Sequence, residues 1–220
     1  MNKTNEVRPA IFFDLDGTLT DPKRGITGCI QYALERMDAH VPTRDELTWC
    51  IGPPLQASFA ELVGDAKAEE GVRLYRERYT DLGIFENEPY AGIPETLHAL
   101  KDSGAALFVA SSKPHVFVHR ILVHFELDTV FEGVFGSELD GTRTDKVELL
   151  QYALDQSGVN AAEAVMIGDR KFDALGAQAN EMEFLGVLYG YGSLEELRSV
   201  GVTKWVESPD EIKAALSPSA

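Results

Sequence analysis

The sequence has little positive charge, few cysteines and no long hydrophobic run. Among 220 residues, 20 are Lys or Arg and 36 are Asp or Glu, which leaves a formal net charge of −16. Because nucleic acids and anionic membranes bind basic surfaces, neither is predicted as a partner. No stretch approaches the roughly 20 apolar residues that span a bilayer. A small anionic substrate remains compatible with the composition, since it needs only a few local cations.

Cysteine usage and the polar start of the chain predict a cytoplasmic protein. Cys29 and Cys50 lack metal-type spacing, and two thiols in a chain of this length suit a reducing compartment better than a disulfide framework. The opening stretch MNKTNEVRP is polar, and no secretory signal is expected there. We expect a monomer or a small homo-oligomer.

Short apolar runs separated by helical patterns predict an α/β fold. The expected strands are 10–14, 105–111, 164–169, 184–190 and 204–208. Helices are expected at 94–104 and 146–158, each of which ends on Gly. Apolar strands that alternate with helices are typical of a parallel sheet covered on both faces. The prediction is a three-layer, Rossmann-like parallel sheet.

Residues 21–88 follow a different pattern. Their apolar residues recur at helical spacing over four candidate helices, one of which opens with a Thr43–Glu46 capping box. We predict an inserted helical domain at 21–88 and an α/β domain formed by 1–20 and 89–220. The alternative is a long crossover within one domain.

Polar side chains stand at the ends of the three strongest predicted strands. Asp14 and Asp16 follow the first strand, Ser111 ends the second and Asp169 ends the third, with Asp173 one helical turn further on. Because the carboxyl ends of parallel strands share one edge, these groups are expected to converge. Hard carboxylate oxygens suit Mg²⁺, and a bound cation would remove the repulsion between the acids.

Two further groups are candidates for binding an anion. Ser111 precedes a helix-like stretch, and its hydroxyl with the following backbone N–H groups would hold a phosphate at that helix start. Lys146 opens another predicted helix and offers a positive charge to the same anion.

These segments resemble the motifs of the haloacid dehalogenase superfamily of phosphohydrolases. DLDGTLTD resembles the first motif, DxDGTLxD, FVASSK resembles the second, and MIGDRKFD is similar to the fourth, GDxxxD. Lys146 is the best match to the third motif, a lone lysine at a helix start. The motifs occur in the family's order across nearly the whole chain, and the first is highly specific. Asp16 stands where the superfamily's dehalogenases lack an acid, which favours phosphoryl transfer.

The resemblance implies a role for each acid. Asp14 would be the nucleophile and would be phosphorylated during turnover. Asp16 would be the general acid and then the general base, and its main-chain carbonyl would bind the metal. Asp169 and Asp173 would complete the Mg²⁺ site together with Asp14.

The phosphate-binding residues implied by the resemblance are Ser111, Ser112, Lys113 and Lys146. Many relatives have a proline after the third-motif lysine, whereas Val147 follows Lys146 here. Lys113 is a rival lysine close to Ser111, and we assign the catalytic role to Lys146.

The segment 21–88 resembles the helical cap of the phosphoglycolate phosphatase-like and β-phosphoglucomutase-like branch. Such a cap closes over the site and contacts the leaving group. Lys23, Arg24 and the IGPP turn at 51–54 are the expected substrate contacts on this segment. Within the branch, the stretches DPKRGIT, IGPPL and LDGTRTDK look most like the 5′-nucleotidase-like subgroup.

The predicted function is a Mg²⁺-dependent phosphatase that hydrolyses a small phosphomonoester through an aspartyl-phosphate. A nucleoside 5′-monophosphate or phosphoglycolate is the expected substrate. One alternative is a phosphomutase of the β-phosphoglucomutase kind, which uses the same acids. Another is a non-catalytic regulatory protein on the same scaffold.

Overall fold

The structure is a computed structural model that describes residues 9–216. The polar stretch at 1–8, where no secretory signal is expected, lies outside the described residues. Within the described chain, every helix is too short or too polar to cross a membrane.

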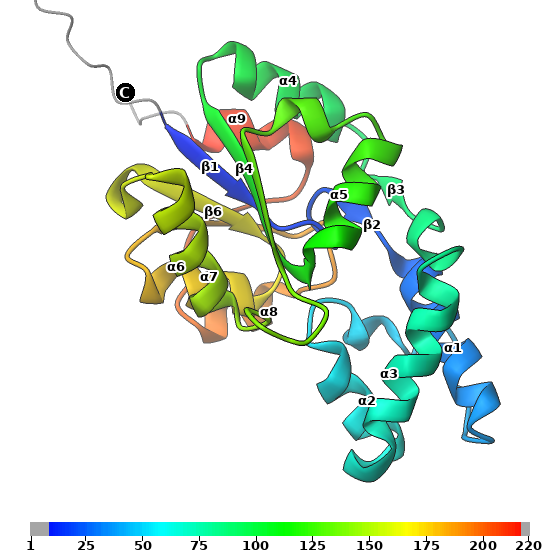
Figure 1. The fold of residues 1–220 in the computed structure, drawn as a ribbon. Helices are drawn as coiled ribbons and strands as arrows, with labels where there is room; N and C mark the ends of the chain where they lie inside the picture. The colour runs from blue at the N-terminus through cyan, green and yellow to red at the C-terminus, as the bar shows by residue number, and fades with distance from the viewer. Residues whose placement is uncertain (1–8, 217–220) are drawn as a thin grey trace, which may run out of the picture.

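The centre of the molecule is a six-stranded sheet in which all neighbouring strands are parallel (Figure 1). In sheet order the strands are β5 (Gly133–Ser137), β4 (Ala106–Pro114), β1 (Ala10–Phe13), β6 (Ala164–Gly168), β7 (Glu183–Val187) and β8 (Trp205–Val206). The predicted α/β parallel sheet is confirmed. The first strand of the chain lies between β4 and β6, which explains why all four of its residues are buried.

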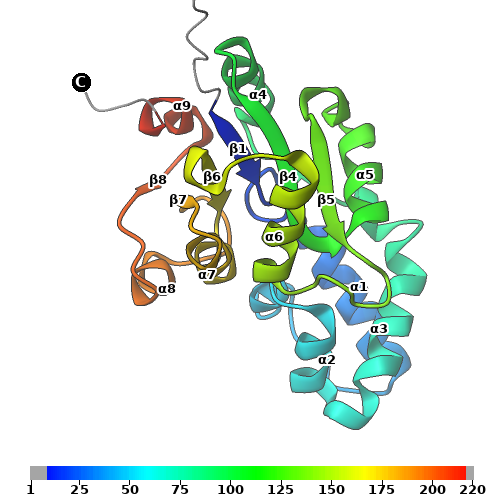
Figure 2. The same cartoon turned by 60° about the vertical axis from the view of Figure 1, so that its left-hand side comes forward.

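Alternate residues of the strands face two helical layers. Ile11 and Phe13 belong to one apolar cluster, which also contains residues of α4 (Ile93–Asp102), α5 (His115–His124) and α9 (Ile212–Ala215). Phe12 points to the other layer, formed by α6 (Lys146–Ser157) and α7 (Lys171–Ala179). Figures 1 and 2 show these two layers on opposite faces of the sheet. A short helix, α8 (Leu194–Ser199), packs beside α7.

Two expectations about β4 and β5 differ from the structure. The strand expected at 105–111 extends through Pro114, with an irregularity in its pairing with β5 between Ser111 and Pro114. Strand β5 was not predicted; it has the sequence GVFGS, which contains two glycines, and it lies at the edge of the sheet. Because glycine has a low strand propensity, the strand conformation of β5 depends on its pairing with β4.

The segment 21–88 leaves and re-enters the α/β body at one place. Its flanks form a short antiparallel pair, β2 (Thr20–Asp21) with β3 (Glu88–Pro89). Between them lie three α-helices, which Figures 1 and 2 place together beside the carboxyl edge of the sheet: α1 (Lys23–Arg36), α2 (Leu55–Val63) and α3 (Asp65–Tyr79).

The expectation of four α-helices in this segment is wrong. The Thr43–Glu46 capping contacts do form, with the backbone N–H of Thr43 donating to Glu46 Oε2 over 2.9 Å. A turn and a 3₁₀-helix, Thr48–Cys50, follow them instead of an α-helix. Pro53 and Pro54 follow after two intervening residues and have no backbone N–H to continue helical hydrogen bonding.

Candidate active site

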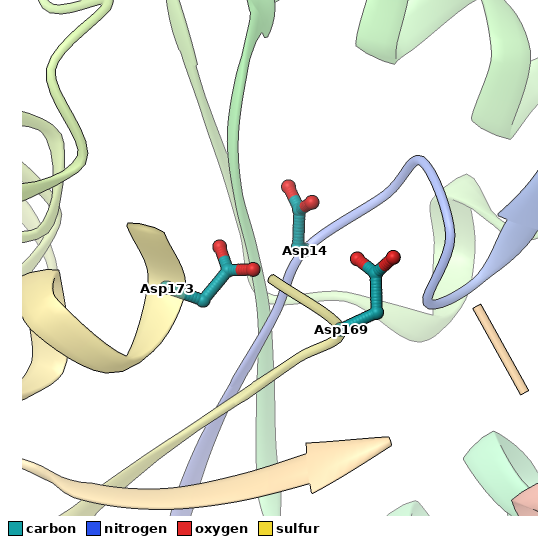
Figure 3. Close-up of side chains that lie close together, drawn as sticks. All are labelled: Asp14, Asp169 and Asp173. Carbon is teal, nitrogen blue, oxygen red and sulfur yellow. The ribbon is translucent and has the colours of Figure 1, made fainter. Parts of the chain in front are cut away.

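The predicted acids meet at the carboxyl edge of the central strands. Asp14 directly follows β1, and its backbone N–H still donates to the Ile167 carbonyl of β6 over 2.9 Å. Asp169 directly follows β6, and Asp173 lies in the first turn of α7. Figure 3 shows the three carboxylates grouped together, although they come from two strand ends and one helix.

The three carboxylates Asp14, Asp169 and Asp173 form a tight, buried acid cluster. One oxygen from each lies within 4.8 Å of the others. Burial raises the pKa of Asp169 well above its usual value, and the charges of Asp173 and Asp14 raise it further. Burial also raises the pKa of Asp173 to about 6, although Lys146 acts in the opposite direction. The cluster is therefore in electrostatic conflict unless a cation is present.

Lys146 supplies one positive charge to this cluster. Its Nζ lies 3.0 Å from Asp14 Oδ1 and 2.7 Å from Asp173 Oδ1, and it donates to the Ala110 carbonyl over 3.0 Å. Burial lowers the pKa of Lys146, but the two carboxylates outweigh that effect and keep the ammonium charged. When all three carboxylates are ionised, this one ammonium leaves two negative charges without a counterpart within the cluster.

The donor set fits a hard divalent cation. Asp169 Oδ1 is buried and has no hydrogen-bond partner among residues 9–216. Its other oxygen is fixed by the backbone N–H groups of Tyr191 and Gly192, at 2.7 and 3.3 Å. Carboxylate oxygens and the uncompensated charge of the acid cluster suit Mg²⁺.

Two glycines allow the close approach of the acids. At Gly17, where φ is +86°, a Cβ atom would lie 2.3 Å from Asp169 Oδ2. At Gly168, a Cβ atom would lie 2.4 Å from Asp173 Cγ. Because any side chain at either position would push a carboxylate away, the acid cluster requires glycine there.

Asp16 belongs to a second charge pair. Its Oδ2 lies 2.7 Å from Lys113 Nζ, which also donates to the hydroxyl of Tyr79 over 2.6 Å. Burial raises the pKa of Asp16, and Lys113 partly offsets the rise. The two rival lysines are thus divided between the two acids of the first motif: Lys146 contacts Asp14 and Lys113 contacts Asp16.

The backbone after Ser111 has a different conformation from the predicted helix start. Ser111 is buried and lines the cavity beside Asp14 and Asp16, together with Ser112. However, β4 continues to Pro114 and α5 starts only at His115, so the backbone N–H groups after Ser111 do not open a helix. The groups that follow Ser111 thus belong to a strand end instead of a helix start, and phosphate binding by Ser111, Ser112, Lys113 and Lys146 stays a prediction.

A cavity of about 570 Å³ is lined by Asp14, Asp16, Ser111 and Lys146, among other residues. Its walls come from the sheet edge, from α2 and α3, from the turn at 51–54 and from the loop at 137–144. On one side, Arg76 of α3 donates to the Leu139 carbonyl of the loop over 2.9 Å. On another, the Arg170 guanidinium donates to the Ile51 carbonyl and, over 2.9 Å, to Glu196 Oε1.

Lys23 and Arg24 lie outside this cavity. Lys23 Nζ pairs with Asp45 Oδ1 at 2.6 Å on the surface. Arg24 lines a separate cavity of about 200 Å³ with Glu86 and Glu88. The turn at 51–54, in contrast, does line the main cavity through Gly52, Pro53 and Pro54.

Arg76 and Tyr79 line the cavity but were not among the predicted site residues. They are three positions apart on α3 and both line the cavity, so helical spacing places them on neighbouring parts of one face. The pattern YRERY carries no chemical signature, since a tyrosine and an arginine at this spacing are common on ordinary amphipathic helices.

Comparisons with known proteins agree with the geometry of the site. The model of the family described as haloacid dehalogenase-like hydrolase matches residues 11–187. A 5′-nucleotidase of Pseudomonas aeruginosa is 49% identical over 193 residues, which cover 87% of each chain. The tyrosine-protein kinase PtkA of Mycobacterium tuberculosis is 36% identical, over 94% of this chain and 72% of the kinase.

Solved structures give the same fold. The crystal structure of a predicted phosphatase from Clostridium acetobutylicum superposes with a TM-score of 0.91 at 40% identity, covering 95% of this chain and 98% of the other.

Proposed function

The chain belongs to the haloacid dehalogenase-like hydrolase family, in which it is a phosphatase, and we propose that it hydrolyses nucleoside 5′-monophosphates through a phosphorylated Asp14. The observation that carries the proposal is the buried acid cluster with Lys146, of which Asp14, Asp173 and Lys146 line the cavity. The side chains of Asp14, Asp169 and Asp173, with the main-chain carbonyl of Asp16, would hold Mg²⁺. Bound Mg²⁺ would neutralise charge on the phosphoryl oxygens.

In the first step, a carboxylate oxygen of Asp14 attacks the phosphorus atom. A bond from this oxygen to phosphorus forms while the bond from phosphorus to the ester oxygen breaks. Asp16 gives its proton to the departing ester oxygen, which leaves as an alcohol. Ser111 and Lys146 stabilise the transferring phosphoryl group, since both lie beside Asp14 in the cavity.

In the second step, water attacks the phosphorus of the aspartyl-phosphate. Asp16, now a carboxylate, takes a proton from this water, and the bond from phosphorus to Asp14 breaks. Inorganic phosphate leaves, and both acids return to their starting states. The different partners of the two acids support this division, because Asp14 pairs with Lys146 and clusters with Asp169 and Asp173, whereas Asp16 pairs with Lys113.

The size and walls of the cavity support a nucleotide substrate. A volume of about 570 Å³ is within the range of sites that enclose drug-sized ligands. Phosphoglycolate would leave much of this space to water. The relative named 5′-nucleotidase is 49% identical to the chain, whereas the phosphoglycolate phosphatase of Colwellia psychrerythraea is 26% identical.

We also propose that residues 21–88 act as a cap domain on a core formed by 1–20 and 89–220. The β2–β3 pair supports this division, because it joins the two ends of the segment at one hinge-like place. Helices α2 and α3 supply one wall of the cavity, so their movement would open or close it.

A substrate panel on the full chain tests the proposal. With Mg²⁺, nucleoside 5′-monophosphates should give the highest kcat/KM among nucleotides, sugar phosphates and phosphoglycolate, and EDTA should abolish phosphate release. Asp14→Asn should fold and release no phosphate. Folded protein without metal-dependent turnover of any ester would refute the enzyme function. In single-turnover experiments, loss of the substrate phosphoryl group without free phosphate would indicate transfer to a sugar or protein hydroxyl instead.

A further inference from the structure

A chain of buried contacts links helix α3 to Asp16. Tyr79, the last residue of α3, has its hydroxyl 2.6 Å from Lys113 Nζ, and Lys113 Nζ lies 2.7 Å from Asp16 Oδ2. Tyr79 comes from the inserted segment, whereas Lys113 belongs to β4 and Asp16 follows β1. The contact chain therefore crosses from the helical segment to the sheet edge.

The contact chain has little freedom to rearrange. The side chain of Lys113 is 7% exposed and that of Asp16 is 11% exposed. The Tyr79 ring stacks on Tyr75 at 5.1 Å and meets the edge of Phe117 at 5.3 Å, which fixes where its hydroxyl points. An ammonium has three donors on a flexible stem, so a second partner beside Asp16 is needed to hold it in one direction.

Lys113 distinguishes the two oxygens of Asp16. Its ammonium pairs with Oδ2, whereas Oδ1 is buried without a hydrogen-bond partner among the described residues. Asp16 also lines the cavity. Lys113 thus fixes the carboxyl group through Oδ2, whereas Oδ1 keeps its hydrogen-bonding capacity unused within the described chain.

We propose that Tyr79 is a positioning residue that, through Lys113, orients Asp16 for proton transfer, so that acid–base catalysis depends on the placement of α3. The inference rests on the proposed role of Asp16 as general acid and base. It gives Lys113 a different role from the expected one, in which Lys113 is one of the phosphate-binding residues. When α3 moves away with the cap, Lys113 loses one partner and Asp16 loses its fixed orientation.

The test compares two esters that differ in their need for a proton. The alkoxide of a nucleoside leaves poorly without protonation, whereas nitrophenolate leaves readily as an anion. The parameter kcat/KM reports the step in which the leaving group departs. We expect Tyr79→Phe to lower kcat/KM for a nucleoside 5′-monophosphate about tenfold, which is a fraction of the full contribution of a general acid. For p-nitrophenyl phosphate, the same variant should lower kcat/KM by less than about twofold.

A second variant, at Lys113, extends the comparison. Lys113→Met should show the same selectivity with a larger loss, because it removes the contact with Asp16 itself. A phosphate-binding lysine would instead affect both esters equally, since both carry the same phosphoryl group. Equal losses for the two esters in Tyr79→Phe or in Lys113→Met would overturn the inference.

Controls separate this inference from the proposed function. Tyr32→Phe is a matched change on the inserted segment, since its exposed hydroxyl donates to Glu77 Oε1 over 2.8 Å outside the cavity, and it should leave both esters unaffected. Asp16→Asn should show the leaving-group selectivity in its strongest form. If Asp16→Asn lacks this selectivity, the proposed role of Asp16 fails. If Asp16→Asn shows it and Tyr79→Phe does not, only the positioning role of Tyr79 fails.

Discussion

Replacing Asp169 by Asn is expected to stabilise the metal-free protein while removing its response to Mg²⁺. Asparagine keeps the shape of the side chain, and its carbonyl oxygen can still accept from the backbone N–H groups of Tyr191 and Gly192. The charge is what changes. Asp169 is fully buried next to Asp14 and Asp173, and the ammonium of Lys146 pairs with those two acids.

The expected gain follows from the spacing of the acids. At the 4.8 Å that bounds the oxygens of the cluster, two full charges repel by about 3.5 kcal/mol at an effective dielectric constant near 20. The partial neutralisation of Asp14 and Asp173 by Lys146 reduces this value, and proton uptake by Asp169, whose pKa is raised, reduces it further. We expect the free energy of unfolding in EDTA to rise by about 2 kcal/mol, which corresponds to a Tm increase of about 4–8 °C for a chain of this length.

Urea unfolding of both proteins, in EDTA and in Mg²⁺, measures the effect. The wild-type protein should gain about 2.7 kcal/mol when Mg²⁺ is present at 100 times its Kd, and Asp169→Asn should gain almost nothing. Asp155→Asn, on the exposed face of α6, is the control and should stay within about 0.5 kcal/mol of the wild type in both buffers. If Asp169→Asn unfolds at a lower urea concentration than the wild type in EDTA, the acids are not in conflict and the reasoning about the metal site is wrong.

Three further predictions concern neighbours of the site. Gly17→Ala should lower the free energy of unfolding by about 2 kcal/mol and weaken Mg²⁺ binding in calorimetry, whereas Gly104→Ala, at a similar φ with no atom within 4 Å of the added Cβ, should cost about 1 kcal/mol. Equal costs would show that contact with Asp169 is irrelevant. Lys146→Met should lower the free energy of unfolding in EDTA by about 3–5 kcal/mol and by less in Mg²⁺; equal losses in both buffers would contradict this. Arg170→Ala, which removes the contact with Ile51, should raise KM for nucleotides more than it lowers kcat, and a fall in kcat alone would argue against it.

Local patterns in the sequence were sufficient for the main strands and for the acid cluster. The apolar runs before Asp14 and Asp169 are unbroken, and buried parallel strands need no alternation, so both strands could be predicted. Their carboxyl ends must share one edge, which brings the two acids together wherever the connecting helices run. Asp173 followed from helical spacing alone.

Local sequence patterns did not predict elements whose conformation depends on packing or pairing with other parts of the chain. β5 contains two glycines and was missed, because its strand conformation comes from pairing with β4. The predicted helix after the Thr43–Glu46 capping box was wrong, since local capping contacts do not ensure that a helix propagates toward Pro53. Lys23 and Arg24 were predicted as substrate contacts, but the orientation of α1 places them outside the main cavity.

The sequence alone thus determined the fold class, the strands β1, β4 and β6, and which acids gather at the sheet edge, because these follow from hydrophobic periodicity and strand direction. Only the tertiary structure decided which lysine serves which acid. Lys146 lies 132 residues from Asp14 along the chain, and Lys113 lies 34 residues from Tyr79. Contacts of this kind depend on how β1, β4, α3 and α6 pack against one another. No local pattern encodes the distance between two side chains that meet only when separate elements are packed together.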